Sequence, residues 1–264
     1  MSLAARAKKS LGQNFLQDRN IARKIVAALA IDSTDNVVEI GPGPGALTSI
    51  IAAERPARLL LIEKDDAFAA ERRDAVYDGT HPDVRSADAL TVPWEEFETP
   101  WKCIGNLPYN IASPLMWEIF SRARSLRRAV FMIQKEVGQR ITAEPGTGTY
   151  GALSVWLQTF TRPKLEFIVP PQVFVPRPKV DSAVLSFVPR EAVPGPAQAA
   201  ALTTVLHKAF QQRRKQLGTI FKGTRLTEDA LPPGSGIAFT VRPERLSPEQ
   251  FLLLAQAWMQ NAAP

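Results

Sequence analysis

The stretch that decides the fold runs from residue 36 to residue 54 and reads NVVEIGPGPGALTSIIAAE. NVVEI (36–40) is a short apolar run typical of a buried strand, and ALTSIIAAE (46–54) has apolar residues at helical spacing. The glycines and prolines of GPGPG (41–45) between them predict a loop. A strand, a glycine loop and a helix in this order predict a parallel α/β sheet, in which ligands bind beyond the carboxyl ends of the strands.

The same alternation continues along the chain on both sides of this stretch. We expect strands at 36–40, 58–63, 83–86, 101–105 and 128–134, and helices at 18–30, 46–54, 66–76, 113–121 and 150–160. Residues 165–190 then hold two strand-like runs joined by prolines, with no room for a crossover helix, so these two strands must be antiparallel. The predicted fold is α/β, a mainly parallel seven-stranded sheet that ends in an antiparallel pair.

A second, smaller domain is predicted at the C-terminal end. Residues 188–200 are rich in proline and alanine and read as a linker, and the residues beyond them have helical patterns without convincing strands. We predict a Rossmann-like domain over residues 1–190 and a small helical domain over residues 191–264.

Composition limits the class of protein. The chain has 264 residues, a net charge of +6 and a pI of about 9.6, and a basic surface favours phosphate-rich polymers or anionic membranes. The longest apolar runs are far short of the roughly 18 residues of a membrane helix, and the N-terminus lacks the hydrophobic stretch of a secretory signal. The single cysteine, Cys103, fits a reducing compartment. We therefore expect a cytoplasmic protein that does not bind membranes.

The glycine loop has two functional interpretations. Gly41, Gly43 and Ala46 satisfy the pattern G-x-G-x-x-G/A, and Glu63 follows at the distance expected of a ribose-binding acid, so a dinucleotide dehydrogenase is a competing hypothesis.

The loop favours a different cofactor. Pro42 and Pro44 remove two N–H donors that a pyrophosphate would need, and Glu39 before the loop would repel a diphosphate. S-adenosylmethionine has a ribose, no phosphate and a positive sulfonium, so it matches the loop better.

Two acids at strand ends complete a candidate cofactor site. Glu63 can accept hydrogen bonds from both ribose hydroxyls, and Asp88 can accept one from the adenine amino group. Each taken alone could equally be a plain surface carboxylate; behind this glycine loop we interpret both as cofactor-binding.

The sequence Asn106-Leu107-Pro108-Tyr109 follows the fourth strand and is the candidate catalytic motif. With S-adenosylmethionine as cofactor, methyl transfer to an exocyclic amine is an in-line displacement at the sulfonium methyl, so positioning should dominate over acid/base groups. The amine of adenine is a poor nucleophile because its lone pair is delocalised into the ring. The carbonyl oxygen of Asn106 and a backbone carbonyl could accept from this amine, Pro108 fixes the local backbone, and Tyr109 can stack on the base. The alternative is an ordinary turn with a packed tyrosine.

Other chemistry has little support in the sequence. His81 and His207 are far apart, so neither a catalytic triad nor a histidine metal cluster is expected. Cys103 reads as a core residue, and Asp65 and Asp66 read as helix-capping residues. We expect no metal.

Beyond these local patterns, the chain resembles the ribosomal RNA adenine dimethyltransferase family over most of its length, the helical end included. The strings that carry the resemblance are GQNFL (12–16), EIGPGPGALT (39–48), IEKD (62–65), NLPYNIASPL (106–115), FMIQKEV (131–137), YGALSV (150–155), VFVPRPKVDSAV (173–184) and AFQQRRKQL (209–217). The resemblance implies a Rossmann-like methyltransferase. Its activity would be the transfer of methyl groups from S-adenosylmethionine to N6 of two adjacent adenines near the 3′ end of small-subunit rRNA, within a 30S precursor.

The resemblance also implies residue roles that the local patterns do not show. It assigns Asn14 and Leu16 to a lid over the cofactor pocket, and Phe174 to the face of the target base opposite Tyr109. It further implies a monomer whose helical domain contacts RNA. The residues expected to contact RNA phosphates are Arg213, Arg214 and Lys215, for which a solvated basic helix face is an equal alternative.

One departure and two alternatives remain. Lys64 stands where the family often has an apolar residue, and strand alternation predicts that it faces away from Glu63 and matters little. The sister family that methylates 23S rRNA shares the glycine loop and the Asn-Leu-Pro-Tyr motif, whereas residues 173–184 and 209–217 favour the small-subunit enzyme. A non-catalytic ribosome-assembly factor with the same fold is the other alternative.

Overall fold

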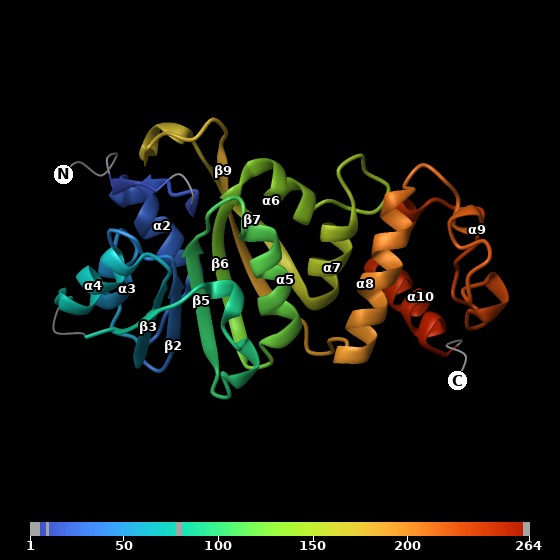
Figure 1. Cartoon of the computed structure of the whole chain (residues 1–264), viewed down its shortest axis with the longest axis horizontal. Coiled ribbons are helices and arrows are strands. Elements are labelled where there is room, and N and C mark those ends of the chain that lie inside the picture. Colours follow the sequence, from blue (N-terminus) through green and yellow to red (C-terminus); the bar gives the residue numbers. More distant parts are fainter. Residues whose placement is uncertain (1–5, 9–10, 78–80, 261–264) are drawn as a thin grey trace. The chain divides into compact units, whose positions relative to one another are not determined.

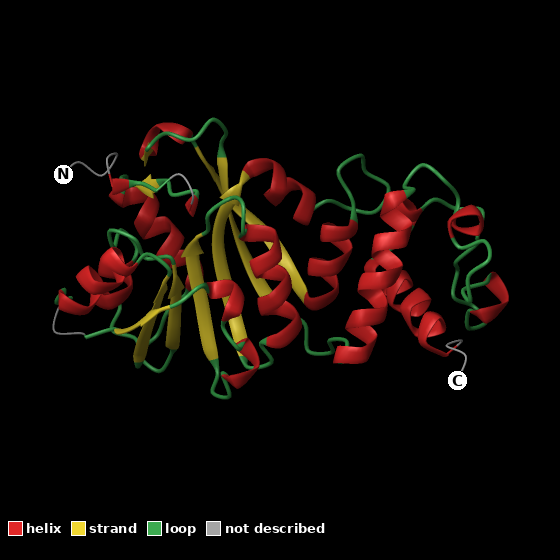
Figure 2. Cartoon of the chain, in the orientation of Figure 1, coloured by secondary structure: helices red, strands yellow, loops and turns green. Residues whose placement is uncertain are grey.

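The protein is described from a computed structural model that covers residues 6–8, 11–77 and 81–260. Its main element is a seven-stranded sheet with the order β4-β3-β2-β5-β6-β9-β7 (Figures 1 and 2). The strands of this sheet are β2 (Asn36–Ile40), β3 (Arg58–Glu63), β4 (Asp83–Ser86), β5 (Trp101–Asn106), β6 (Leu126–Gln134), β7 (Thr161–Val169) and β9 (Ser182–Pro189). The first five are parallel, and β9 runs antiparallel to β6. The predicted fold class is confirmed.

The helices follow the predicted alternation with small differences. They are α2 (Arg19–Leu29), α3 (Thr48–Ala53), α4 (Asp66–Asp74), α5 (Ala112–Arg122), α6 (Lys135–Ile141), α7 (Ala152–Phe160), α8 (Pro196–Gln211), α9 (Leu217–Ile220) and α10 (Pro248–Gln260). Helix α6 follows β6 directly and was not predicted, because its few apolar residues continue the pattern of the strand.

Helix α2 shows why these residues form this element. The carboxylate of Asp18 accepts hydrogen bonds from the backbone N–H groups of Asn20 and Ile21, as a helix N-cap does. The helix ends at Ala30, whose φ of 53° is left-handed. Its apolar residues recur every three or four positions and form a buried stripe, so the helix packs against the sheet.

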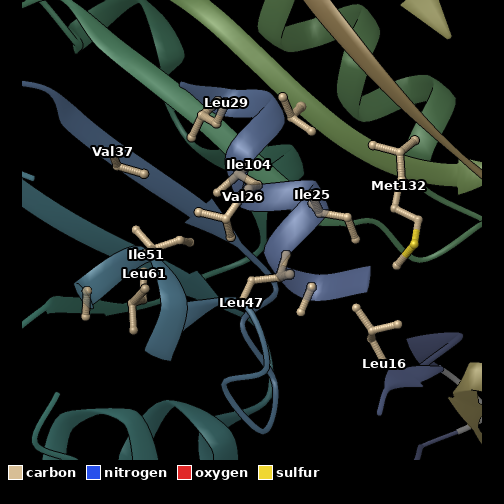
Figure 3. Close-up of a cluster of buried hydrophobic side chains, with 14 of the residues drawn as sticks. Leu16, Ile25, Val26, Leu29, Val37, Leu47, Ile51, Leu61, Ile104 and Met132 are labelled. Carbon is tan, nitrogen blue, oxygen red and sulfur yellow. The ribbon is translucent and has the colours of Figure 1, made fainter. Parts of the chain in front are cut away.

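The hydrophobic core lies on both faces of the sheet. Figure 3 shows Ile25 and Leu29 of α2 among buried side chains of the sheet such as Ile104. On the opposite face, the ring of Phe120 in α5 lies 5.0 Å from that of Phe187 in β9. Because both faces are covered, the central strands are continuous apolar runs rather than alternating ones. Cys103 in β5 is fully buried, which confirms its predicted role in the core.

A small second sheet joins two distant parts of the chain. Strand β1 (Phe15–Leu16) pairs with β8 (Phe174–Val175) in antiparallel orientation, with Leu16 opposite Phe174. Taken without the family resemblance, GQNFL (12–16) has the pattern of a loop, but its last two residues form strand β1. Two-residue strands have no measurable periodicity, so only the tertiary structure reveals this pairing.

The chain divides into two compact units, residues 1–138 with 163–189 and residues 139–162 with 190–264. The second unit therefore includes α7 as well as the C-terminal residues. Helix α7 belongs there because it packs against α8 and α10. The division after residue 190 that the sequence predicts puts α7 with the larger domain instead.

Candidate functional site

A cavity lies in the first unit, at the carboxyl ends of β2, β3, β4 and β5. Four segments line it: residues 11–15, the glycine loop with Ile40, the ends of β3 and β4, and residues 106–111. This is the position at which parallel α/β sheets bind ligands. Of the predicted cofactor-binding residues, all but Leu16 line the cavity, namely Asn14, Gly41, Gly43, Glu63, Asp88 and Asn106.

The glycine loop follows β2 and needs glycine at each turn. Gly41, Gly43 and Gly45 have φ values of 66°, 50° and 89°, a conformation that other residues rarely adopt. The N–H of Gly41 donates to the carbonyl of Ile62 at 2.9 Å, which ties the loop to β3. A Cβ built on Gly43 would lie 3.3 Å from the ring of Phe15, so the N-terminal segment packs closely over the loop.

Glu63, the last residue of β3, is fixed by the backbone. Its side chain is buried, and its two oxygens accept from the N–H of Asp65 at 2.8 Å and the N–H of Gly43 at 2.9 Å. Burial raises the pKa of Glu63 above its usual range, and these two N–H groups oppose the rise. Each carboxylate oxygen has a further lone pair, so Glu63 can still accept from a ligand in the cavity.

Asp88 follows β4 and is held differently. Its Oδ1 accepts from the N–H of Leu90 at 3.0 Å, and its Oδ2 accepts from Nζ of Lys64 at 2.6 Å. Partial burial would raise the pKa of Asp88, but the Lys64 ammonium and the Leu90 N–H hold it below its usual range.

The prediction that Lys64 faces away from the site is wrong, because Lys64 lines the cavity. Strand alternation holds only inside a strand, and β3 ends at Glu63, so the side chain of the next residue is free to turn toward Asp88.

Asn106 ends β5 at the rim of the cavity. Its Nδ2 donates to the backbone carbonyl of Asn14 at 2.9 Å, which leaves the Oδ1 of Asn106 as the acceptor of this side chain. The same hydrogen bond brings Asn14, a residue that local sequence patterns did not reveal, into the site. The bond fixes the plane of the Asn106 amide.

The three residues after Asn106 also line the cavity. Leu107 is buried, and its N–H donates to the carbonyl of Met132 at 3.0 Å. The carbonyl of Pro108 accepts from two N–H groups at the start of α5, so it is already used. The hydroxyl of Tyr109 forms a 2.8 Å hydrogen bond with that of Ser182, and burial raises the pKa of the Tyr109 phenol. The motif is thus anchored at each position.

Leu16 and Phe174 lie outside the lining of the cavity. Both are buried, 4% and 2% exposed, and both belong to the hydrophobic cluster around α2. The two residues lie opposite each other where strands β1 and β8 pair. The expected roles of Leu16 as part of a lid and of Phe174 as a stacking residue stay predictions.

The N-terminal segment is held over the site by α4. Asp65, the N-cap of α4, accepts from Nζ of Lys8 at 2.8 Å and from Nε2 of Gln13 at 3.4 Å. The capping role predicted for Asp65 is confirmed. Lys8 and Gln13 were not predicted, since no local pattern marks a residue whose partner lies in another element.

The predicted RNA-contacting residues belong to the second unit. Arg213, Arg214 and Lys215 form a turn after α8 rather than a helix face. Arg213 donates to the carbonyl of Thr147 at 3.1 Å, while Arg214 and Lys215 are exposed. Their contact with RNA stays a prediction.

The described residues hold neither a cluster of metal ligands nor a membrane-spanning helix. Within residues 6–8, 11–77 and 81–260, no three His, Cys, Asp or Glu side chains gather in a way that could hold a metal ion. No helix in this described part is long and apolar enough to cross a membrane.

Comparisons with known proteins agree with this geometry. A family model described as ribosomal RNA adenine dimethylase matches residues 4–260. The chain is 58% identical to the ribosomal RNA small subunit methyltransferase A of Nitratidesulfovibrio vulgaris, over 97% of this chain and 98% of the relative. It is 42% identical to the protein of the same name from Bordetella pertussis, over 99% and 97%.

Two solved structures share the fold over nearly the whole chain. A dimethyladenosine transferase from Plasmodium falciparum is 26% identical with a TM-score of 0.77, and covers 94% of this chain and 98% of its own. The 23S rRNA methyltransferase ErmE is also 26% identical, with a TM-score of 0.69, and covers 93% and 100%. With a family model that spans almost every residue and a cavity built from the same motifs, the chain belongs to the ribosomal RNA adenine dimethylase family.

Proposed function

We propose that this protein uses S-adenosylmethionine to dimethylate N6 of two adjacent adenines near the 3′ end of small-subunit rRNA. The observation that carries the proposal is the hydrogen bond from Asn106 Nδ2 to the Asn14 carbonyl. It leaves an amide oxygen as acceptor in the same cavity as the glycine loop and Glu63. Membership of the family and the names of the relatives support the same conclusion.

The residues of the cavity fit S-adenosylmethionine. Gly41 offers an open approach, because a Cβ built there would meet no atom within 4 Å. Glu63 presents buried carboxylate oxygens with unused lone pairs for ribose hydroxyls, and Asp88 presents an acceptor for an amino group. The loop contains two prolines and would make a poor pyrophosphate cradle. When bound, the cofactor supplies an electrophilic methyl group.

The chain's own residues would then position the adenine amine. The Asn106 Oδ1, together with the backbone carbonyl of Leu107, would accept from the two N–H groups of the amine. That arrangement would direct its lone pair toward the cofactor site. The Pro108 carbonyl is excluded because two N–H groups of α5 already use it. Tyr109 would stack on the base, and its hydrogen bond with Ser182 would keep the ring in place.

The partner and the cellular setting belong to the same proposal. We propose that the substrate is small-subunit rRNA within a 30S precursor, and that the protein acts as a cytoplasmic monomer without a metal. The names of the curated relatives favour the small subunit over 23S rRNA. Arg213, Arg214 and Lys215 would contact phosphates of the RNA.

The test is to incubate the protein with labelled cofactor and with unmethylated 30S particles. We expect N6,N6-dimethyladenine in the 16S rRNA and none when 50S particles replace the 30S particles. Label in 23S rRNA alone would favour the sister activity, and no label in either would favour a non-catalytic assembly factor. Titration with NAD tests the dehydrogenase hypothesis, because a dehydrogenase of this kind must bind NAD.

Asn106→Ala tests the catalytic assignment. We expect methylation to fall at least about a hundredfold, because the adenine amine loses its positioned acceptor, while cofactor affinity weakens only partly. Unchanged turnover by this variant would contradict the proposed role of Asn106.

A further inference from the structure

The glycine loop is held from outside the cavity by Arg72 of α4. Nη1 of Arg72 donates to the carbonyl of Pro44 at 2.9 Å and to the hydroxyl of Tyr77 at 2.5 Å. The arginine side chain is only 12% exposed. Its Nε is buried and has no hydrogen-bond partner among the described residues, and its Nη2 lies 3.7 Å from Oε2 of Glu71, so Nη1 makes the contacts with the loop and with Tyr77.

Arg72 also occupies the space beside the third glycine of the loop. A Cβ built on Gly45 would lie 2.1 Å from Nη1 of Arg72 and 3.1 Å from the hydroxyl of Tyr77. Gly45 is therefore required for two reasons, its positive φ and the closeness of the guanidinium. The arginine and the glycine fit together as a pair.

A buried acid, Glu39, is affected by the charge of this guanidinium. Glu39, the last residue but one of β2, is 1% exposed, and its Oε2 has no hydrogen-bond partner among the described residues. Burial, and then the charge of Glu63, raise the pKa of Glu39, and the positive charge of Arg72 lowers it. Arg72 thus opposes the rise in the pKa of Glu39, and it also holds a carbonyl in the middle of the loop.

The other side of the loop is held by the proposed ribose acid. The N–H of Gly43 donates to Oε2 of Glu63, one residue before the carbonyl that Arg72 holds. A loop with three residues at positive φ has many alternative conformations, and the two contacts on either side select one of them.

We infer that Arg72 is a positioning residue for cofactor binding, which fixes the Pro44 carbonyl and so keeps the Gly43 N–H on Glu63. This inference rests on the proposed function for the identity of the cofactor. Arg72 touches no reacting atom, so its loss should weaken cofactor binding and leave the chemical step unchanged once the cofactor is saturating.

The experiment measures the Kd of S-adenosylmethionine by calorimetry on the full chain, and KM and kcat with 30S particles. Arg72→Met keeps an unbranched apolar side chain and removes all the donors of the guanidinium. We expect Kd and KM for the cofactor to rise on the order of tenfold, with kcat within about twofold. Arg73→Met is the control, because Arg73 is the exposed neighbour on the same helix and should leave all three unchanged.

Three results would overturn the inference: an unchanged Kd for Arg72→Met, a matching loss from Arg73→Met, or a fall in kcat at saturating cofactor. Should Arg72→Met fail to fold by circular dichroism, Arg72→Lys replaces it. The lysine keeps the positive charge but has a single donor nitrogen. The role is supported if the Kd of Arg72→Lys lies between that of wild type and that of the double variant Arg72→Lys/Tyr77→Phe. Equal Kd values for all of them contradict it. A wild-type protein that does not bind the cofactor would contradict the proposed function instead.

A double-mutant cycle tests the pairing of Arg72 with Gly45. Gly45→Ala should raise the Kd of the cofactor by a larger factor in the wild-type background than in Arg72→Ala, since the shorter side chain leaves room for the new Cβ. Equal factors in the two backgrounds would show that Gly45 is needed for its φ alone, and the fit of the two residues would be contradicted.

Discussion

Glu63 and Asp88 are carboxylates at the ends of the neighbouring strands β3 and β4, and both line the cavity, yet the chain holds them by different means. Both oxygens of Glu63 accept from backbone N–H groups, and the side chain is buried. Asp88 has one oxygen on a backbone N–H and the other on Lys64, and a quarter of its side chain is exposed. One acid is set by the path of the backbone and the other by a neighbouring side chain.

This difference teaches which parts of the site a substitution can adjust. Glu63 and Glu39 are the buried acids, and we call them the floor, although only Glu63 lines the cavity. Removing a buried group there leaves its partners unsatisfied at large cost. Asp88 and Lys64 form an exposed rim, where solvent screens the charges and each contact contributes little. We therefore expect substitutions at the floor to have larger effects than substitutions at the rim.

The largest effect is expected from Glu63→Ala. Two buried N–H groups, those of Gly43 and Asp65, would lose their acceptor, and the cofactor would lose its ribose partner. We expect the Kd of S-adenosylmethionine to rise at least about a hundredfold. Calorimetry measures the Kd, with Asp74→Ala on α4 as the exposed control. A loss below tenfold would mean that the floor is no more rigid than the rim.

A smaller effect concerns the pH dependence of stability. Burial raises the pKa of Glu39 to about 8, so between about pH 4.5 and pH 8 the folded protein binds a proton that the unfolded chain has released. The stability that this proton confers is complete below about pH 4.5 and is lost as pH rises toward 8.

Glu39→Gln removes this pH-dependent contribution to the free energy of unfolding. We expect the free energy of unfolding of the variant, relative to wild type, to rise with pH by up to about 1.4 kcal/mol per pH unit in this window and to level off above it. Urea unfolding at several pH values measures the difference. Parallel curves for the two proteins would show that Glu39 is not buried in a protonated form.

At the rim, Asp88→Asn should have a modest effect. The amide keeps one oxygen acceptor but loses the charge that pairs with Lys64. We expect the Kd of the cofactor to rise about fivefold to tenfold, which corresponds to roughly 1 kcal/mol. A loss as large as that of Glu63→Ala would erase the distinction between floor and rim.

The smallest effect is expected from Lys64→Leu. Lysine occupies an oxygen of Asp88 and places a positive charge beside a site for a cationic cofactor. Its removal should tighten binding about twofold to fivefold at low salt, and the gain should shrink as salt is added. Lys64→Arg is the control and should bind as wild type does; weaker binding by Lys64→Leu would mean that Lys64 supports the cofactor instead.

Local sequence patterns predicted the parts of the site that follow strands. Glu63, Asp88 and Asn106 were found because each ends or follows a parallel strand, and such ends meet at one edge of the sheet. The error at Lys64 has the same origin, since alternation was extended one residue past the end of β3. Asn14 and Phe174 came from the family resemblance alone, because each reaches its place through a pairing with a distant segment.

The sequence by itself determined the α/β sheet, the glycine loop after β2 and the acids beside it, because strand and helix periodicity and the positive φ of glycine are local properties. Only the tertiary structure decided which groups hold those residues. It placed Arg72 on the Pro44 carbonyl, Asn14 on Asn106 and Lys64 on Asp88. These contacts join residues from different elements, and their free energy depends on burial and distance, which no local pattern of residues specifies.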